Sequence, residues 1–214
     1  MPGFLFYWIS WCIWIYLMFI MKKNHPYRYP LAFFVCLAII FSGYTIELFG
    51  IEIRLSLFPV WLLGCLLLAK CNWKTLMYLC LCVVIITFSA TTFFIMALFD
   101  PFWVIIDLVI LEGLLAVFLT SLLDVGFWQR IGVFFIGFIQ AELLYGYLLK
   151  GFGIHYEIGS FHFLDGLSVS LVFIILWGVI ETIYLYFQRN QILEKEKQLQ
   201  QCQNMYILFF SGLL

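Results

Sequence analysis

The chain has 214 residues, of which 65% are hydrophobic, 21% are aromatic and only 11% are charged. A soluble globular domain is about half apolar and about a quarter charged, and the mean hydropathy of +1.08 lies well to the apolar side. This composition excludes a disordered chain, a nucleic-acid-binding protein and a secreted disulfide scaffold. It predicts a polytopic membrane protein whose main partner is the lipid bilayer.

Seven apolar segments are candidates to cross a bilayer, because about 20 residues of helix span its hydrocarbon core. The third is the weakest, since it is short and contains Pro59 near its start. We expect an all-α bundle of seven transmembrane helices in residues 1–187, followed by a cytoplasmic polar helix and an apolar tail in 188–214. The expected spans are residues 3–21, 30–49, 55–69, 75–99, 102–123, 131–149 and 163–187.

Basic residues predict the orientation, because loops rich in Lys and Arg stay in the cytoplasm. With the amino terminus outside and the carboxyl terminus in the cytosol, only Arg54 and Lys150 of the 11 basic residues lie outside. The other nine are Lys22, Lys23, Arg28, Lys70, Lys74, Arg130, Arg189, Lys195 and Lys197. This distribution also favours a third span that crosses, since its loss would place Lys70 and Lys74 outside.

Polar side chains inside the expected spans are functional candidates, because a charge at membrane depth is costly. They concentrate in spans five to seven, where Glu112 falls near the bilayer midplane and the others fall closer to span ends. Glu47 and Asp165 lie near outer span ends, where they can reach water. The candidate intramembrane polar site consists of Asp107, Glu112, Gln140, Glu142 and Glu181.

Two interpretations of these carboxylates remain open, because none has a basic partner at membrane depth in the sequence. Either some are protonated and donate hydrogen bonds across helix interfaces, or they line a wet cleft that attracts a cation. Asp107 and Glu112 are five positions apart, about 140° around a helix, which disfavours one narrow site for both. On the second interpretation, Glu112 and Glu142 are the pair that would hold a cation or a proton.

Small residues one turn apart predict close helix contacts in the last two spans. The pairs are Gly137 with Ala141 in span six and Gly178 with Thr182 in span seven. Since Gly178 lies three positions before Glu181, we expect Glu181 to face a neighbouring helix.

The external loop between spans six and seven contains two histidines, His155 and His162, on either side of Glu157. Such a group could bind a divalent metal weakly, but its spacing matches no zinc signature. We expect a solvated loop, and we predict no metal site and no cofactor.

The carboxyl-terminal segment 188–203 is polar, with an apolar residue in every seventh position. One apolar column is a poor coiled coil. The segment is expected to extend span seven as a cytoplasmic helix that is either solvated or bound to a protein partner. Residues 205–214 are apolar again but are too few to cross the membrane.

Motifs of common enzymes are absent from the sequence. It contains no phosphate-binding Gly-Lys-Ser/Thr loop, no His-Glu-x-x-His, no Gly-x-Ser-x-Gly and no kinase catalytic motif. The acidic residues are also scattered singly rather than paired with a nucleophile. We therefore expect a protein that is not an enzyme.

Three stretches carry a resemblance to a known family. They are Gly3-Phe-Leu-Phe-Tyr-Trp-Ile-Ser-Trp-Cys-Ile-Trp-Ile-Tyr, the Asp100-Pro-Phe-Trp turn, and Gln140-Ala-Glu-Leu-Leu-Tyr in span six. They resemble the YphA-like family of small integral membrane proteins from spore-forming Gram-positive bacteria. The resemblance extends to about residue 188 and implies a location in the bacterial cytoplasmic membrane. The family has no assigned activity, so the resemblance implies no site residue.

These observations predict a multi-pass membrane protein that acts by interaction, as a sensor or an accessory subunit. The alternative is a small cation- or proton-linked transporter that uses Glu112 and Glu142. The two differ in a measurable way, since only the transporter moves an ion in a manner that depends on Glu112.

Overall fold

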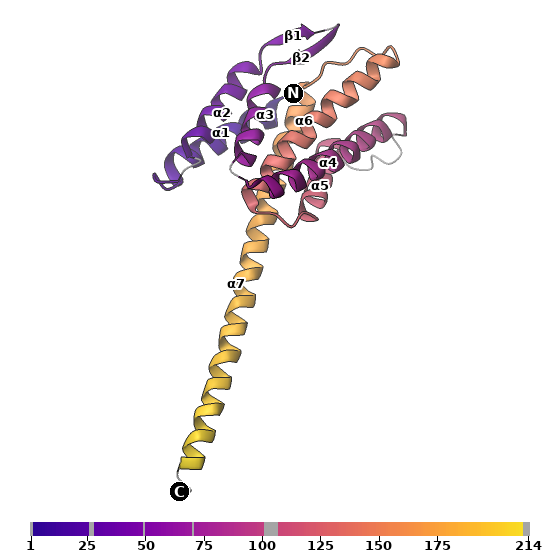
Figure 1. Cartoon of the computed structure of the whole chain (residues 1–214). Helices are drawn as coiled ribbons and strands as arrows, with labels where there is room; N and C mark the ends of the chain where they lie inside the picture. The colour runs from indigo at the N-terminus through magenta and orange to yellow at the C-terminus, as the bar shows by residue number, and fades with distance from the viewer. Residues whose placement is uncertain (1, 26–27, 49, 70, 101–106, 212–214) are drawn as a thin grey trace. The chain divides into compact units, whose positions relative to one another are not determined.

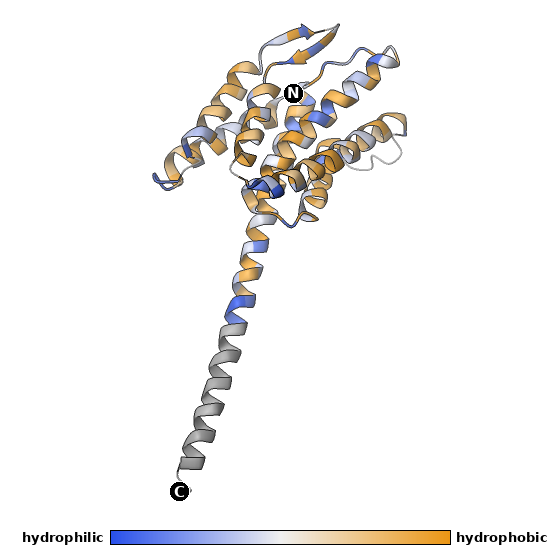
Figure 2. Ribbon diagram, viewed as in Figure 1, coloured by the Kyte–Doolittle hydropathy of each residue, from blue (hydrophilic) through white to orange (hydrophobic). Residues whose placement is uncertain are grey.

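The computed structural model describes residues 2–211 except 26–27, 49, 70 and 101–106, with side chains described as far as Gln191. The chain divides into two compact units, Met1–Ile174 and Ile175–Leu214, which we describe separately. The first unit is a bundle of helices with one β-hairpin (Figure 1). Most helical residues are hydrophobic, and hydrophilic residues gather at the connections between helices (Figure 2). The expected all-α bundle is thus confirmed, with a small hairpin added.

The first helix, α1 (Phe4–Ile15), continues into a short π-helix, η1 (Tyr16–Ile20). The carboxyl-terminal carbonyls of a helix lack intrahelical donors and carry partial negative charge, so a cation stabilises them. Arg28, the first residue of α2 (Arg28–Phe41), provides this cation. Its Nε donates to the Leu17 carbonyl at 3.0 Å, and its Nη2 donates to the Met18 carbonyl. Arg28 therefore joins the end of the first helix to the start of the second.

The β-hairpin follows α2 and shortens the expected second span. Strands β1 (Thr45–Leu48) and β2 (Ile51–Arg54) pair antiparallel, with Thr45 opposite Arg54. Isoleucine and glutamate alternate through this segment, a period of two that favours a strand over a helix. Gly50 in the turn has a φ of 71°, which glycine adopts without strain. The helix consequently ends at Phe41 rather than continuing through residue 49.

Helix α6 (Phe127–Gly151) lies at the centre of the first unit, since most of its side chains are buried. Helix α3 (Leu57–Leu68) approaches it at two glycines, where a Cβ on Gly132 would lie 3.1 Å from the Gly64 carbonyl oxygen. Helix α4 (Trp73–Phe99) packs against another part of α6. The three helices thus form the core that positions the polar groups described below.

The expected small-residue contact of span six is confirmed at the interface between α4 and α6. A Cβ on Gly137 would lie 2.7 Å from a methyl carbon of Ile86. The hydroxyls of Thr87 and Thr91 in α4 donate to the carbonyls of Gly137 and Ala141, each at 3.3 Å. Glycine and alanine therefore allow the close helix approach that membrane bundles use.

Contacts between connections define two ends of the bundle. At one end, the segment 152–160 pairs with β2, and the rings of Phe99 and Phe152 lie 6.1 Å apart. At the other end, the ring of His25 lies 5.6 Å from that of Trp128, and Gln129 donates to the Cys71 sulfur at 3.1 Å. The second, fourth and sixth connections between helices thus meet at one end of the bundle. The first, third and fifth connections meet at the other end.

Helix lengths differ from those of the expected spans. Among the described residues, three helical segments are long and apolar enough to cross a membrane, namely Trp73–Phe99, Phe127–Gly151 and Phe161–Gln191. The other apolar segments are Phe4–Ile20, Arg28–Phe41, Leu57–Leu68 and Leu108–Ser121, each of 10 to 17 residues. The fifth expected span begins in residues 102–106, which lie outside the described residues.

The second unit consists of the continuation of α7 (Phe161–Ser211), a helix of 51 residues. The helix passes without interruption through the polar segment 188–203. Its apolar side chains between residues 176 and 187 are largely exposed, as are those of Glu181 and Arg189. The expected apolar tail extends into residues 212–214, which lie outside the described residues.

Candidate functional site

A cavity of about 360 Å³ lies in the first unit beside α4, α5 (Leu108–Ser121) and α6. The segment 152–160 and the first turn of α7 complete its wall. Two of the sequence candidates, Glu112 and Glu142, line it together. Its lining residues are Phe94, Ala97, Leu98, Leu108, Glu112, Glu142, Tyr145, Tyr156, Ser160, His162 and Phe163.

Glu142 anchors the segment 152–160 to α6. Its side chain is 1% exposed, and its Oε1 accepts hydrogen bonds from the Tyr156 hydroxyl at 2.8 Å and from the Gly159 backbone N–H at 3.0 Å. Burial, followed by the neighbouring Glu142 carboxylate, raises the pKa of Tyr156 well above its usual range. Tyr156 therefore keeps its proton and remains a hydrogen-bond donor.

Glu112 faces the same cavity from α5 and has a different environment. Its residue is 4% exposed, yet no hydrogen-bond donor among the described residues contacts its carboxylate. The carboxylate lies against Gly166 of α7, where a Cβ would overlap its Oε2. Gly166 thus provides the space that the carboxylate occupies. The carboxylate of Glu142 lines the same cavity, and an uncompensated buried carboxylate is costly.

Four aromatic rings form a continuous wall of edge-to-face contacts along the cavity. Phe163 and Phe94 have ring centroids 6.4 Å apart, Phe94 and Tyr145 5.8 Å apart, and Tyr145 and Tyr156 5.1 Å apart. These separations are typical of favourable aromatic pairs. The cavity therefore combines apolar walls with two carboxylates, a composition that suits a small ligand with a localised positive charge.

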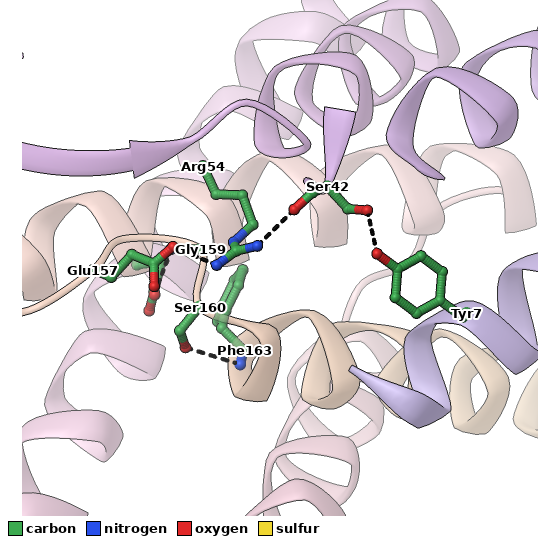
Figure 3. Close-up of polar contacts among 8 residues, drawn as sticks. Tyr7, Ser42, Arg54, Glu157, Gly159, Ser160 and Phe163 are labelled. Carbon is green, nitrogen blue, oxygen red and sulfur yellow. Dashed lines mark hydrogen bonds and ion pairs between the residues drawn. The ribbon is translucent and has the colours of Figure 1, made fainter. Parts of the chain in front are cut away.

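A second polar cluster, built around Arg54, holds the hairpin and the segment 152–160 together (Figure 3). The Arg54 guanidinium donates to the Ser42 carbonyl at 2.5 Å and pairs with the Glu157 carboxylate. It also lies 3.8 Å from the centroid of the Phe161 ring. The Ser42 hydroxyl is 2.7 Å from that of Tyr7, so the cluster extends to α1.

The backbone of the same segment adds two hydrogen bonds to β2. The Arg54 N–H donates to the Ile158 carbonyl at 3.0 Å, and the Ile158 N–H donates to the Glu52 carbonyl at 2.9 Å. The expected solvated loop is therefore found only in part, since residues 150–155 are exposed, whereas Ile158 is 2% exposed and Glu157 is paired. His155 and His162 remain exposed.

The other sequence candidates lie apart from the cavity. Asp107 is the N-cap of α5, and its side chain accepts from the Val109 N–H at 3.2 Å. In the described residues the helix thus begins after Asp107, whereas the sequence placed it inside a span. Gln140 contacts the Thr87 hydroxyl at 3.3 Å, in the interface with α4. Glu181 is in the second unit, where its side chain is exposed.

Sequence reasoning missed residues of both groups, including Phe94, Tyr156 and Gly166 at the cavity and Ser42 and Tyr7 in the Arg54 cluster. It also placed Asp165 near water, whereas this residue is 7% exposed and hydrogen-bonded to the amino end of α1. A local signal existed, since Tyr-Glu-Ile-Gly-Ser (residues 156–160) is unusual in a solvated loop because it combines an aromatic and a β-branched residue with polar ones.

Apolar side chains cover the exterior of these helices, including Trp8 at 61%, Phe33 at 60% and Phe88 at 61% exposure. The carboxylates of Glu112, Glu142 and Asp165 are instead buried inside the bundle, which is the arrangement of an α-helical integral membrane protein. The chain belongs to the YphA-like integral membrane protein family, whose profile matches residues 2–201.

A protein of Bacillus subtilis (strain 168), described as uncharacterized protein YphA, is 25% identical over 191 residues. The alignment covers 89% of this chain and 94% of that protein. No solved structure matches the chain. The predicted resemblance to this family is thus confirmed.

Proposed function

We propose that the protein is a non-enzymatic membrane sensor or accessory subunit that binds a small solute in the cavity and reports it through α7. The observation that carries this proposal is that His162 and Phe163, in the first turn of α7, line the cavity. The same helix continues unbroken to Ser211. A ligand that alters the first turn therefore acts on an element whose far end is available to a partner.

The sequence of the far end supports an output role. Residues 188–203 are rich in Gln, Glu and Lys, in contrast to the apolar chain before them. A polar helix of this kind gains little from lipid and is suited to contact with a soluble partner or another helix. Its expected location is the cytosolic face of a bacterial cytoplasmic membrane, in agreement with the bacterial relative.

Site-specific photocrosslinking in cells tests the sensor. A photoreactive residue at Gln191, which is exposed, should give a discrete adduct with a partner protein. The Glu112→Gln variant should change the adduct yield at least about threefold, because it alters the cavity. Glu47→Gln, on the exposed face of the hairpin, is the matched control. Absence of an adduct, or an adduct indifferent to Glu112, would contradict the proposal.

A second candidate is a small cation- or proton-linked transporter. The specific observation in its favour is that α5 and α6 each place one carboxylate on the same cavity. Buried carboxylates of this kind form proton relays and ion pathways in membrane carriers. Proteoliposomes with a trapped pH dye and imposed sodium or proton gradients should show a flux that Glu112→Gln abolishes. Wild-type flux equal to that of empty vesicles would exclude this candidate.

We propose further that all seven apolar segments cross the membrane, with the amino terminus outside. The contacts at the two ends of the bundle support this topology. The hairpin contacts the segment 152–160, and the connection containing His25 contacts Trp128. Each contact joins connections that seven spans place on the same side. The 12 residues of α3 reach only about 18 Å, so local thinning of the bilayer is required there.

Reporter insertions at four described positions test the topology. Glu47 and His155 should be accessible from outside, whereas Lys74 and Arg189 should be accessible from the cytoplasm. Accessibility of Lys74 from outside would show that α3 does not cross.

A further inference from the structure

The two carboxylates of the cavity differ in the hydrogen bonds that they accept. Oε1 of Glu142 already accepts two hydrogen bonds, from Tyr156 and Gly159. Glu112 is also buried and faces the cavity, but no donor among the described residues contacts its carboxylate. The space that remains, about 360 Å³, is within the range of small-molecule sites. Glu112 is therefore a buried carboxylate of the cavity to which the described residues provide no hydrogen-bond donor.

The chemistry of the walls discriminates between possible partners for Glu112. A hard metal cation needs about six or more oxygen ligands, and no group of three or more His, Cys, Asp or Glu in the described residues could hold a metal ion. The walls are instead aromatic, with Phe94, Tyr145, Tyr156 and Phe163 in contact with one another. Aromatic rings beside a carboxylate favour ammonium groups that carry carbon substituents.

We infer that the cavity binds an organic monocation, a protonated amine or a quaternary ammonium, with its charge beside Glu112 and its apolar body against the aromatic wall. This inference rests on the proposed function, since it names the class of solute that the cavity accepts. The carboxylate supplies the opposite charge, and the rings supply an attractive surface for the carbon groups next to nitrogen. A neutral molecule of the same shape leaves Glu112 without a partner and binds less well.

Calorimetric titration of the full chain in a neutral maltoside detergent tests the inference. Choline and its neutral isostere 3,3-dimethylbutan-1-ol differ in one atom that carries the charge, and benzyltrimethylammonium adds an aromatic body. We expect both cations to bind at least about tenfold more tightly than the isostere. Sodium chloride and calcium chloride serve as inorganic probes, and blank micelles correct for partitioning of the neutral compound.

Two variants assign the site. Glu112→Gln keeps the shape of the side chain and removes its charge, so it should weaken binding of the cations at least about tenfold. Phe94→Leu should weaken it about three- to tenfold through loss of the ring. Glu47→Gln should leave binding unchanged. Elution volume and tryptophan fluorescence of each variant verify that the fold is retained.

The outcomes separate this inference from the proposed function. Equal binding of choline and its isostere, or cation binding indifferent to both Glu112→Gln and Phe94→Leu, would overturn the organic-cation assignment. Binding of sodium or calcium alone, lost in Glu112→Gln, would also overturn it but leave the solute-binding cavity in place. If no probe binds and the Gln191 adduct is indifferent to Glu112, both proposals fail.

Discussion

The carboxylate of Asp165 accepts a hydrogen bond from the backbone N–H of Gly3, 162 positions earlier, at 2.7 Å. Its other oxygen accepts from the Phe6 N–H, also at 2.7 Å. Gly3 is the N-cap of α1, and its side chain cannot satisfy the amides of the first turn. Asp165 supplies that function from α7, and its negative charge suits the positive end of the helix dipole. The first and last helices of the first unit are thereby joined.

Replacement of Asp165 by Asn should destabilise the first unit by about 1–3 kcal/mol. The amide can accept only one of the two hydrogen bonds and presents an NH₂ group to the other donor, which leaves a buried N–H without a partner. Thermal unfolding in detergent, followed by tryptophan fluorescence, measures the effect. Glu47→Gln, which changes an exposed carboxylate in the same way, is the control. Equal melting temperatures for wild type and Asp165→Asn would contradict the proposed capping role.

The pair of Arg54 and Glu157 should show energetic coupling in a double-mutant cycle. Arg54→Ala removes the ion pair, the hydrogen bond to the Ser42 carbonyl and the ring contact with Phe161, so it should cost more than Glu157→Gln. We expect about 1–2 kcal/mol for Glu157→Gln, because this side chain is 32% exposed and partly solvated. The double variant should cost less than the sum of the single variants by about 0.5–2 kcal/mol. Strict additivity would show that the ion pair does not hold the segment 152–160.

The sequence predicts the helical bundle and much of its close packing for clear physical reasons. Apolar segments of sufficient length become helices in lipid, because every backbone group must be bonded within its own segment. Gly137 and Ala141 lie one turn apart, which is visible in the sequence, and they do contact α4. Glu112 and Glu142 could be selected because charge at membrane depth is costly, and both face one cavity.

Tertiary contacts that join distant segments explain what the sequence does not reveal. The aromatic wall of the cavity needs Phe94 of α4 to meet Phe163 of α7, and 25 phenylalanines offer many equivalent candidates. The role of Asp165 depends on the position of Gly3, which no local pattern encodes. The hairpin was hidden because its isoleucines also fit an apolar span. Local periodicity thus predicts the helices and strands. The partners of buried polar groups can be identified only from the three-dimensional structure.

Replacement of Gly132 by Ala should force α3 and α6 apart. The added methyl would lie 2.8 Å from Leu68 Cδ2 and 3.1 Å from the Gly64 carbonyl oxygen, and the backbone atom cannot move by a rotamer change. Overpacking of this kind costs about 1–3 kcal/mol. Gly151→Ala, at the end of the same helix with no atom within 4 Å, is the matched control and should be neutral or slightly stabilising. A melting temperature for Gly132→Ala equal to that of Gly151→Ala would contradict the close approach of the two helices.

Alkaline pH should weaken the attachment of the segment 152–160 at Tyr156. The pKa of Tyr156 is raised in the folded protein, first by burial and then by the Glu142 carboxylate. An unfolded tyrosine ionises near pH 10, so above that pH the unfolded state binds fewer protons and stability falls as pH rises. Wild type should exceed Tyr156→Phe by about 1–3 kcal/mol at neutral pH, through the hydrogen bond to Glu142.

This difference should shrink between about pH 10 and pH 11, since only wild type has the ionisation to lose. Chemical unfolding at several pH values measures it. Tyr44→Phe, at a side chain that is 61% exposed, provides the control for ionisation of the other tyrosines. A constant gap between wild type and Tyr156→Phe from pH 8 to pH 11 would show that the phenol is not held in its neutral form by the fold.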